Sequence, residues 1–327
     1  MATKLTFNQQ TLPFRTEFLI AGTHCLVSTN SYDILRVVAQ WPRNTQQGCG
    51  PSFEMEVIVE PALDGVPEHS AHFRGTRHLV FAKLPPRSFL TYDLLRRRVH
   101  AVLSDAAACD LSFWNTRFFP ITIGVLGTTL GLVPLHCACI DRNGDGTLIA
   151  GVSGAGKSTL ATAMSQLGFS LLSDDWTYIS KQRSALIAHG LYSPLKLLPD
   201  AARFFPDLRR FSPRMSLNGE LAYEIESVQS IGLSATGVSQ PGCIFFLERT
   251  SAPGCYLLRC RPEYVREFFT KNAERLPDEL PEAKAFRASV IKVLSDRPAW
   301  ILRTGENPQV TAEHLNDFLL EANRATA

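Results

Sequence analysis

The sequence lacks an excess of charge of either sign, and its first 22 residues lack a continuous apolar run. Thirty-three Lys and Arg residues against 31 Asp and Glu give a formal net charge of +2, whereas nucleic-acid-binding proteins usually carry a basic footprint. Residues 1–22 include Lys4, Arg15 and Glu17 and contain no continuous apolar run. We therefore expect no nucleic-acid partner and predict no signal peptide.

The cysteines lack the spacings that metal or redox motifs require. The chain has eight cysteines, but none form a CxxC pair or a Cys/His zinc pattern. Cys137 and Cys139 are expected on one face of a strand. Buried free thiols are the favoured interpretation for the cysteines, and a redox role for this pair is the alternative.

Phe118–Ile140 contains no Asp, Glu, Lys or Arg over 23 residues, a length that could cross a bilayer. Pro120 and Pro134, together with three glycines and three threonines, favour a buried helix followed by a strand. No membrane partner is therefore expected.

The N-terminal third has the pattern of an α+β module. Phe53–Glu60 alternates apolar and acidic positions, as a half-buried strand does. Arg77–Ala82 is a second candidate strand. Ser88–Leu103 is ambiguous, because Tyr92, Leu95 and Val99 suit a helix face while its start could be extended. Its Arg96–Arg98 run is interpreted as a solvated helical face rather than an anion site. We assign residues 1–111 to this module, with a possible role in substrate recognition, and residues 112–327 to a catalytic domain.

The second part has the order of elements of an α/β core. A helical stretch from Phe113 towards Leu130 is followed by a strand at Val133–Ile140. The turn Asp141–Gly146 has two glycines that can supply positive φ. A further strand, Thr147–Ala150, ends at a glycine-rich motif.

Residues Gly151–Ser158, here called the phosphate loop, fit the pattern G-x-x-x-x-G-K-[ST]. The glycines let backbone N–H groups converge on phosphate oxygens. Lys157 is expected to reach the β- and γ-phosphates of ATP, and Ser158 to ligate Mg²⁺. The residues predicted to bind the nucleotide are Gly151, Ser153, Gly154, Ala155, Gly156, Lys157, Ser158 and Thr159.

A helix over Ser158–Leu167 is predicted after the loop, ending at Gly168. The next segment, Phe169–Asp175, is predicted as a buried strand that ends in two carboxylates. One carboxylate can hold Mg²⁺, and the other can take a proton from an attacking hydroxyl. Adjacent strand residues point to opposite faces, so both serve one cleft only if the chain bends. The alternative is that one aspartate only caps the following turn.

These segments resemble the catalytic core of HPr serine kinase/phosphorylase and its shorter relatives, whose core is similar to that of phosphoenolpyruvate carboxykinase. The matching residues are Leu135-His136, Gly144–Ser158, Gly168-Phe169 and Leu172–Asp175, with weaker similarity at Ile244–Arg249 and Trp300–Arg303.

The resemblance implies an α/β P-loop kinase core and a site residue for each role. Asp174 would be the catalytic carboxylate, with His136 and Lys157 beside it, and Ser158 and Asp175 would be the metal ligands. It also implies ATP and Mg²⁺ as cofactors and a serine hydroxyl of a peptide or protein as acceptor. A homo-oligomer and a cytoplasmic location are expected as well.

The sequence departs from this family in two places. Tyr192–Pro199 lacks the Glu-x-Arg-Gly segment of the bifunctional enzymes, and Thr159 replaces a glutamate. The pattern is closer to the shorter relatives, which include kinases of precursor peptides. A small-molecule kinase and a non-catalytic nucleotide sensor are the alternatives. Pro199–Leu217 could form a wall of either an open groove or a lid. Candidate cations for the transferred phosphate are Lys196, Arg249, Arg259 and Arg261.

Overall fold

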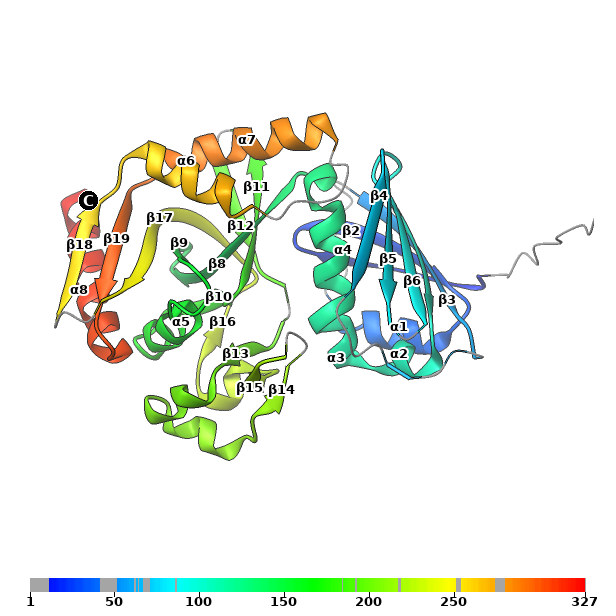
Figure 1. Ribbon diagram of the computed structural model, residues 1–327, viewed down its shortest axis with the longest axis horizontal. Coiled ribbons are helices and arrows are strands. Elements are labelled where there is room, and N and C mark those ends of the chain that lie inside the picture. Colours follow the sequence, from blue (N-terminus) through cyan, green and yellow to red (C-terminus); the bar gives the residue numbers. More distant parts are fainter. Residues whose placement is uncertain are drawn as a thin grey trace, which may run out of the picture. The chain divides into compact units, whose positions relative to one another are not determined.

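The chain folds into two compact units, unit 1 over Met1–Leu126 and unit 2 over Gly127–Ala327 (Figure 1). The computed structural model describes residues 12–41, 52–61, 63, 65–66, 71–85, 87–183, 185–191, 193–216, 219–250, 254–273 and 280–326.

Unit 1 is a seven-stranded sheet with helices on one face. Its strand order is β1-β2-β3-β7-β6-β5-β4, with parallel pairs at β2–β3 and β3–β7 and antiparallel pairs elsewhere. The elements are β1 (Phe14–Ile20), β2 (Thr23–Thr29), α1 (Tyr32–Val38), β3 (Ser52–Val59), β4 (His72–Thr76), β5 (Leu79–Leu84), β6 (Ser88–Asp93), β7 (Arg98–Leu103), α2 (Asp105–Cys109), α3 (Leu111–Phe113), the π-helix η1 (Trp114–Phe118) and α4 (Phe119–Leu126).

The ambiguous segment Ser88–Leu103 forms the hairpin β6–β7, and the helical interpretation of Arg96–Arg98 was wrong. Leu90 and Tyr92 are buried at every second position, which is the strand period. Leu95, which suggested a helix face, is 63% exposed in the turn.

The helical segment after residue 111 belongs to unit 1, whereas the sequence placed residues 112–126 with the second domain. Aromatic packing explains this difference. The Phe119 ring lies 5.4 Å from that of Phe18 in β1 and 4.6 Å from that of Trp41. Trp114 donates its indole N–H to the Ala107 carbonyl at 3.0 Å. The apolar side chains of η1 and α4 therefore complete the core of unit 1.

Unit 2 is a mixed α/β unit, in agreement with the predicted α/β class. Its elements are η2 (Gly127–Leu130), β8 (Leu132–Arg142), β9 (Asp145–Ala150), α5 (Lys157–Gln166), β10 (Ser170–Ser173), β11 (Trp176–Gln182), β12 (Ala185–His189), β13 (Leu195–Leu197), η3 (Pro199–Arg203), η4 (Pro206–Arg210), β14 (Arg214–Met215), β15 (Leu221–Ile225), η5 (Val228–Ile231), β16 (Ser234–Ala235), β17 (Val238–Arg249), β18 (Cys255–Arg259), α6 (Pro262–Lys271), α7 (Pro281–Ser295), β19 (Ala299–Thr304) and α8 (Pro308–Thr326).

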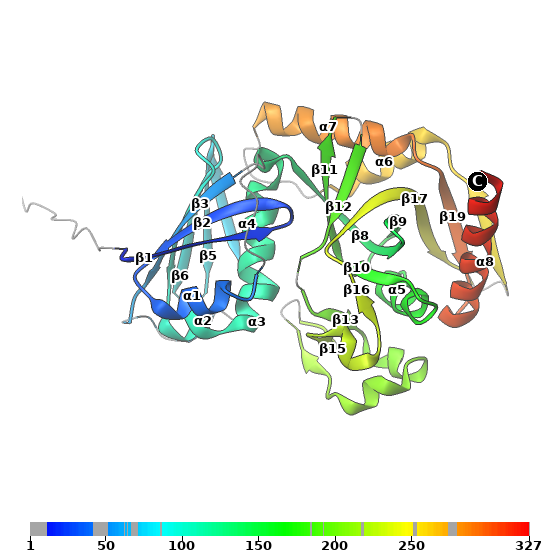
Figure 2. The same cartoon turned by 180° about the vertical axis from the view of Figure 1, so that it is seen from behind.

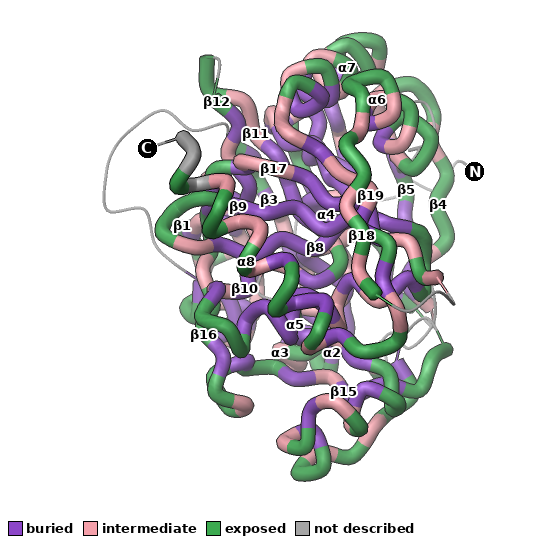
Figure 3. Tube along the Cα trace, turned by 90° about the vertical axis from the view of Figure 1, so that its left-hand side faces the viewer, coloured by how far each residue is buried: buried purple, intermediate pink, exposed green. Residues whose placement is uncertain are grey.

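The main sheet of unit 2 has nine strands in the order β16-β10-β8-β11-β12-β17-β19-β18, and β9 pairs with both β8 and β17. The parallel strands β9, β17 and β19 lie side by side. Helices cover both faces, as the front and back views in Figures 1 and 2 show. Ile149 and Phe245 pack in the core of α5 and α8, while Leu148 and Phe246 pack in the core of α6 and α7. Because both faces are covered, the middle parts of these strands, such as Leu148–Ala150 and Ile244–Leu247, are apolar runs, and Figure 3 shows buried stretches along β8 and β17.

The elements around the phosphate loop match the expected order. β8 and β9 meet at a turn in which Asn143 and Gly144 have φ of +57° and +92°. Gly146 lies inside β9 instead, where an added Cβ would come within 2.8 Å of the Ser239 hydroxyl oxygen. α5 ends before Gly168, which has a φ of +92°.

The uncharged stretch Phe118–Ile140 forms the end of η1, then α4, η2 and most of β8. None of the helices in the described ranges combines the length and the apolar character that crossing a membrane requires. Cys137 and Cys139 are buried free thiols in one apolar cluster, so they share a face of β8 as predicted.

Candidate active site

The phosphate loop connects β9 to α5 in a conformation that glycine makes possible. An added Cβ at Gly151 would come within 2.9 Å of the Leu247 carbonyl oxygen. Gly156, with a φ of +99°, is the N-cap of α5 and has no side chain to cap the helix. The first N–H groups of α5 are therefore not capped by a side chain at this position, which is the arrangement of an anion site.

Lys157 is the first residue of α5 and is buried, with 7% of its surface exposed. Its Nζ donates to the carbonyl oxygens of Gly151 and Val152 at 3.2 and 3.3 Å. Burial lowers the pKa of the ammonium group, and the charges of Asp175 and Asp174 act in the opposite direction. A phosphate in the loop would offer this cation a stronger acceptor than two neutral carbonyls.

Ser158 and Asp174 come together next to the loop. The Ser158 hydroxyl donates to the main-chain carbonyl of Asp174 at 3.4 Å. The Asp174 side chain is buried, and its Oδ2 accepts the backbone N–H of Lys196 at 2.9 Å. The pKa of Asp174 is raised to about 7, mainly by burial and also by the charge of Asp175, while the hydrogen bond from the Lys196 N–H acts in the opposite direction. A carboxyl group with this pKa can exchange a proton near neutral pH.

The two adjacent aspartates lie in a bend between β10 and β11 rather than within a strand. Asp175 is exposed, and its Oδ1 accepts the Nε2–H of His136 at 2.8 Å. The His136 ring stacks on Trp176, with the ring centroids 5.3 Å apart. The bend thus gives the two carboxylates different surroundings, one dry and one facing water beside an imidazole.

Of the four candidate cations, Lys196 and Arg249 lie at the site. Lys196 donates its backbone N–H to Asp174, and its ammonium pairs with Glu220 at 2.9 Å. Arg249, at the end of β17, donates from Nε to the Ala155 carbonyl at 3.2 Å. Arg259 lies over the Trp300 ring instead, and Arg261 directly precedes α6.

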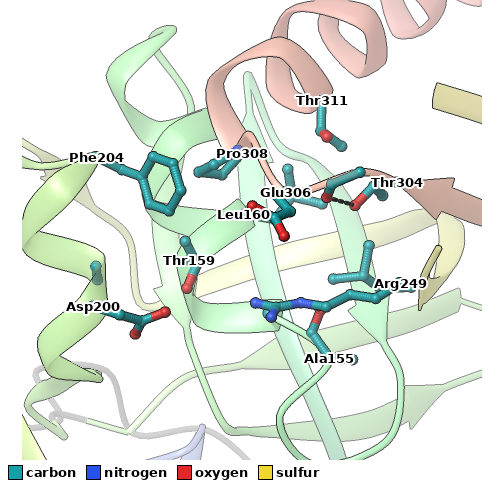
Figure 4. A pocket seen from close by; sticks show the side chains of 14 residues that line it. Ala155, Thr159, Leu160, Asp200, Phe204, Arg249, Thr304, Glu306, Pro308 and Thr311 are labelled. Carbon is teal, nitrogen blue, oxygen red and sulfur yellow. Dashed lines mark hydrogen bonds between the residues drawn. The ribbon is translucent and has the colours of Figure 1, made fainter. Parts of the chain in front are cut away.

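A solvent-open pocket lies on the other side of the α5 N-terminus (Figure 4). Thr159 lines it together with Arg249. Asp200, Phe204 and Glu306 line it too, and the sequence analysis did not identify them as site residues. Phe204 had been noted only as part of a possible wall, and no local motif distinguishes Glu306. This cluster depends on the tertiary fold, since its members come from separate segments of the chain.

The described residues contain no group of three or more His, Cys, Asp or Glu side chains that could hold a metal ion. Mg²⁺ does not require such a cage, because it usually keeps several waters and binds one or two carboxylates plus substrate phosphates. The Ser158 hydroxyl and the exposed Asp175 carboxylate are hard oxygen donors beside the loop. This donor set fits Mg²⁺ on a nucleotide and does not fit a permanently bound transition metal.

No family model matches this chain, and no curated protein matches its sequence. Among solved structures, the HPr(Ser) kinase/phosphatase from Coxiella burnetii is similar at 12% sequence identity with a TM-score of 0.30. The match covers 58% of this chain and 98% of that protein.

Proposed function

We propose that this chain is an ATP-dependent kinase that transfers the γ-phosphoryl group to a hydroxyl, with a serine of a peptide or protein as the acceptor. The observation that supports this most directly is the position of Asp174. Its carboxyl group has a pKa raised to about 7 by burial and lies beside Ser158 of the phosphate loop. A protein that only senses a nucleotide needs the loop but has no use for a base poised next to it.

The phosphates bind at the α5 N-terminus, where uncapped N–H groups and the Lys157 ammonium neutralise their charge. Ser158 and Asp175 would hold Mg²⁺, which when bound neutralises charge on the β- and γ-phosphate oxygens. His136 keeps the Asp175 carboxylate oriented through its Nε2–H. Lys196 fixes the Asp174 carboxylate through its backbone N–H.

Asp174 acts as the general base. Its carboxylate accepts the proton of the acceptor hydroxyl, whose oxygen bonds to the γ-phosphorus. The bond from that phosphorus to the β,γ-bridging oxygen breaks, so ADP leaves and a phosphate ester forms. The transition state gains from nearby cations, and Lys157 supplies positive charge beside Asp174.

The resemblance of residues 135–175 to serine kinases supports the choice of a serine in a peptide or protein as the acceptor. Asp175 and His136 are both partly exposed, with 59% and 32% of their side chains accessible. An acceptor that approaches Asp174 from the side of Asp175 and His136 would therefore contact side chains that are open to solvent.

The test is to incubate the purified protein with Mg²⁺ and γ-labelled ATP, alone and with candidate precursor peptides. Transfer of label to a serine, lost in Asp174→Asn, is the expected result. Label released only as free phosphate would remove the peptide-kinase assignment. ATP that binds but is never cleaved under any condition would instead indicate a nucleotide sensor without enzymatic activity.

A further inference from the structure

The pocket beside the α5 N-terminus is lined by groups of both charges. Gly156, whose following N–H groups have no side-chain cap, and the Arg249 guanidinium supply positive charge. The exposed residues Asp200 and Glu306 supply carboxylates from two separate walls (Figure 4). A ligand that suits these walls carries an anionic group and, elsewhere on the molecule, hydrogen-bond donors.

The two helices that meet at this pocket differ in their N-termini. α8 begins beside it, but Asn307 Oδ1 accepts the backbone N–H groups of Gln309 and Val310 at 3.0 and 3.4 Å. The α8 N-terminus is thus already capped, and Glu306 adds a negative charge there. Phosphate therefore favours the α5 end of the pocket over the α8 end.

The position of Asp174 sets the direction in which a bound nucleotide extends. Neither Ser158 nor Asp174 lines the pocket, whereas Thr159 does. Successive helix residues are about 100° apart around the axis, so Ser158 and Thr159 face different sides of α5. With the γ-phosphate at Ser158 and Asp174, the opposite end of a triphosphate chain leaves the loop on the Thr159 side.

The pocket walls suit a nucleoside. Phe204, Leu160 and Pro308 give it aromatic and apolar surface, against which a base can stack. Carboxylates such as those of Asp200 and Glu306 accept hydrogen bonds from hydroxyl or amino groups. A hydrogen bond also joins the two segments that carry Phe204 and Pro308, because the Gln309 side chain donates to the Phe204 carbonyl at 2.9 Å.

We infer that this pocket is the nucleoside subsite, where Phe204 packs against the base and Glu306 and Asp200 accept hydrogen bonds from the nucleoside. This inference rests on the proposed function, since it assumes that the loop binds the triphosphate. The subsite selects a nucleotide over a bare polyphosphate, and Arg249 lies where the α-phosphate joins the nucleoside.

The test compares the affinity of the full chain for MgATP with its affinity for magnesium tripolyphosphate, both by calorimetry. The readout is the ratio of the two affinities, because a change of net charge or a small disturbance of the loop affects both ligands. Phe204→Ala is expected to lower the preference for MgATP about fivefold or more, as expected for a lost stacking partner. Glu306→Gln is expected to lower it about threefold, since one charge-assisted hydrogen bond becomes neutral.

Two matched variants serve as controls. Phe211→Ala truncates another half-buried phenylalanine of the same apolar cluster outside the pocket, and Glu313→Gln neutralises an exposed glutamate of α8. Both should leave the ratio within about twofold, as expected for groups that do not touch the ligand.

If the ratio of MgATP to tripolyphosphate affinity is unchanged in both Phe204→Ala and Glu306→Gln, the pocket is not the nucleoside subsite. A wild-type protein that binds tripolyphosphate as tightly as MgATP also overturns the subsite and leaves the phosphate site standing. Equal weakening of both ligands by Phe204→Ala would assign that residue a structural role and overturn its role in binding. If the wild type binds neither ligand, the proposed function itself fails, and the subsite fails with it.

Discussion

On the exposed face of the sheet in unit 1, acidic and basic side chains pair across neighbouring strands. Arg98 lies 2.7 Å from Glu54, and His100 lies 2.9 Å from Glu56. In unit 2, by contrast, Lys157 and Asp174 are each 7% exposed, and their hydrogen bonds run to backbone atoms. Exposed ion pairs contribute little to the free energy of unfolding, and exposed charges lose little hydration. Burying an ionisable group, by contrast, destabilises the fold. The presence of two buried ionisable groups, Lys157 and Asp174, beside a glycine-rich loop therefore indicates that they have a function.

The largest expected effect is on transfer in Asp174→Asn. Asparagine keeps the shape and the acceptor for the Lys196 N–H but cannot take a proton, so we expect phosphoryl transfer to fall by about 100- to 10,000-fold. ATP binding should stay within a few-fold of the wild type. Single-turnover kinetics with labelled ATP measures the first, and calorimetry the second. Asp207→Asn, at a half-exposed residue of η4 that pairs with Arg210, should leave both unchanged. Wild-type rates of transfer in Asp174→Asn would show that Asp174 is not the general base.

The next effect is on nucleotide affinity in Lys157→Ala. The substitution removes a buried cation at the loop, and we expect affinity for MgATP to fall by about 100-fold, the scale of a lost charge-assisted contact to phosphate. Calorimetry is the measurement. Lys292→Ala, on the exposed side of α7, is the matched control. A loss of less than threefold would show that the buried ammonium serves the fold rather than the ligand.

The buried aspartate also predicts a pH dependence of stability. Between about pH 4 and 7 the folded state holds a proton on Asp174 that the unfolded state releases, because the folded pKa is about 7 against 3.8. The free energy of unfolding should therefore fall as pH rises through this window, by at most roughly 1.4 kcal/mol per pH unit. His189, whose pKa burial lowers to about 4, changes stability in the opposite direction.

Urea denaturation of the wild type and Asp174→Asn at pH 5, 6, 7 and 8 isolates the aspartate, because His189 is common to both proteins. The variant should gain stability relative to the wild type as pH rises from 5 to 7. A difference between the two proteins that is independent of pH would contradict the raised pKa of Asp174.

The smallest effect is expected on the exposed face of unit 1. Glu54→Gln removes one partner of the Arg98 pair, and we expect the free energy of unfolding to change by less than about 1 kcal/mol. Urea denaturation at neutral pH is the measurement, with phosphoryl transfer expected to stay unchanged. A loss of several kcal/mol would mean that the charge pairs in unit 1 carry as much energy as the buried charges in unit 2.

The local elements of unit 2 could be predicted because each has its own pattern. The strand before the loop, the helix after it and the turn at Gly144 follow from apolar runs and glycine positions. The hairpin at Ser88–Leu103 was harder, because Tyr92, Leu95 and Val99 also fit a helical spacing. Pairing of β6 with β5 and β7 makes this segment a strand. The sequence of the segment alone does not show which strands it will pair with.

The sequence by itself determined the phosphate loop and α5, because backbone sterics at the glycines and the position of Lys157 act over a few residues. It also supplied two adjacent aspartates without deciding between them. Only the tertiary structure decided that Asp174 is buried against Lys196 while Asp175 meets His136 and water. It also brought Thr159, Phe204 and Glu306 to one pocket. Burial and convergence depend on which distant segments pack together, and no local residue pattern encodes that packing.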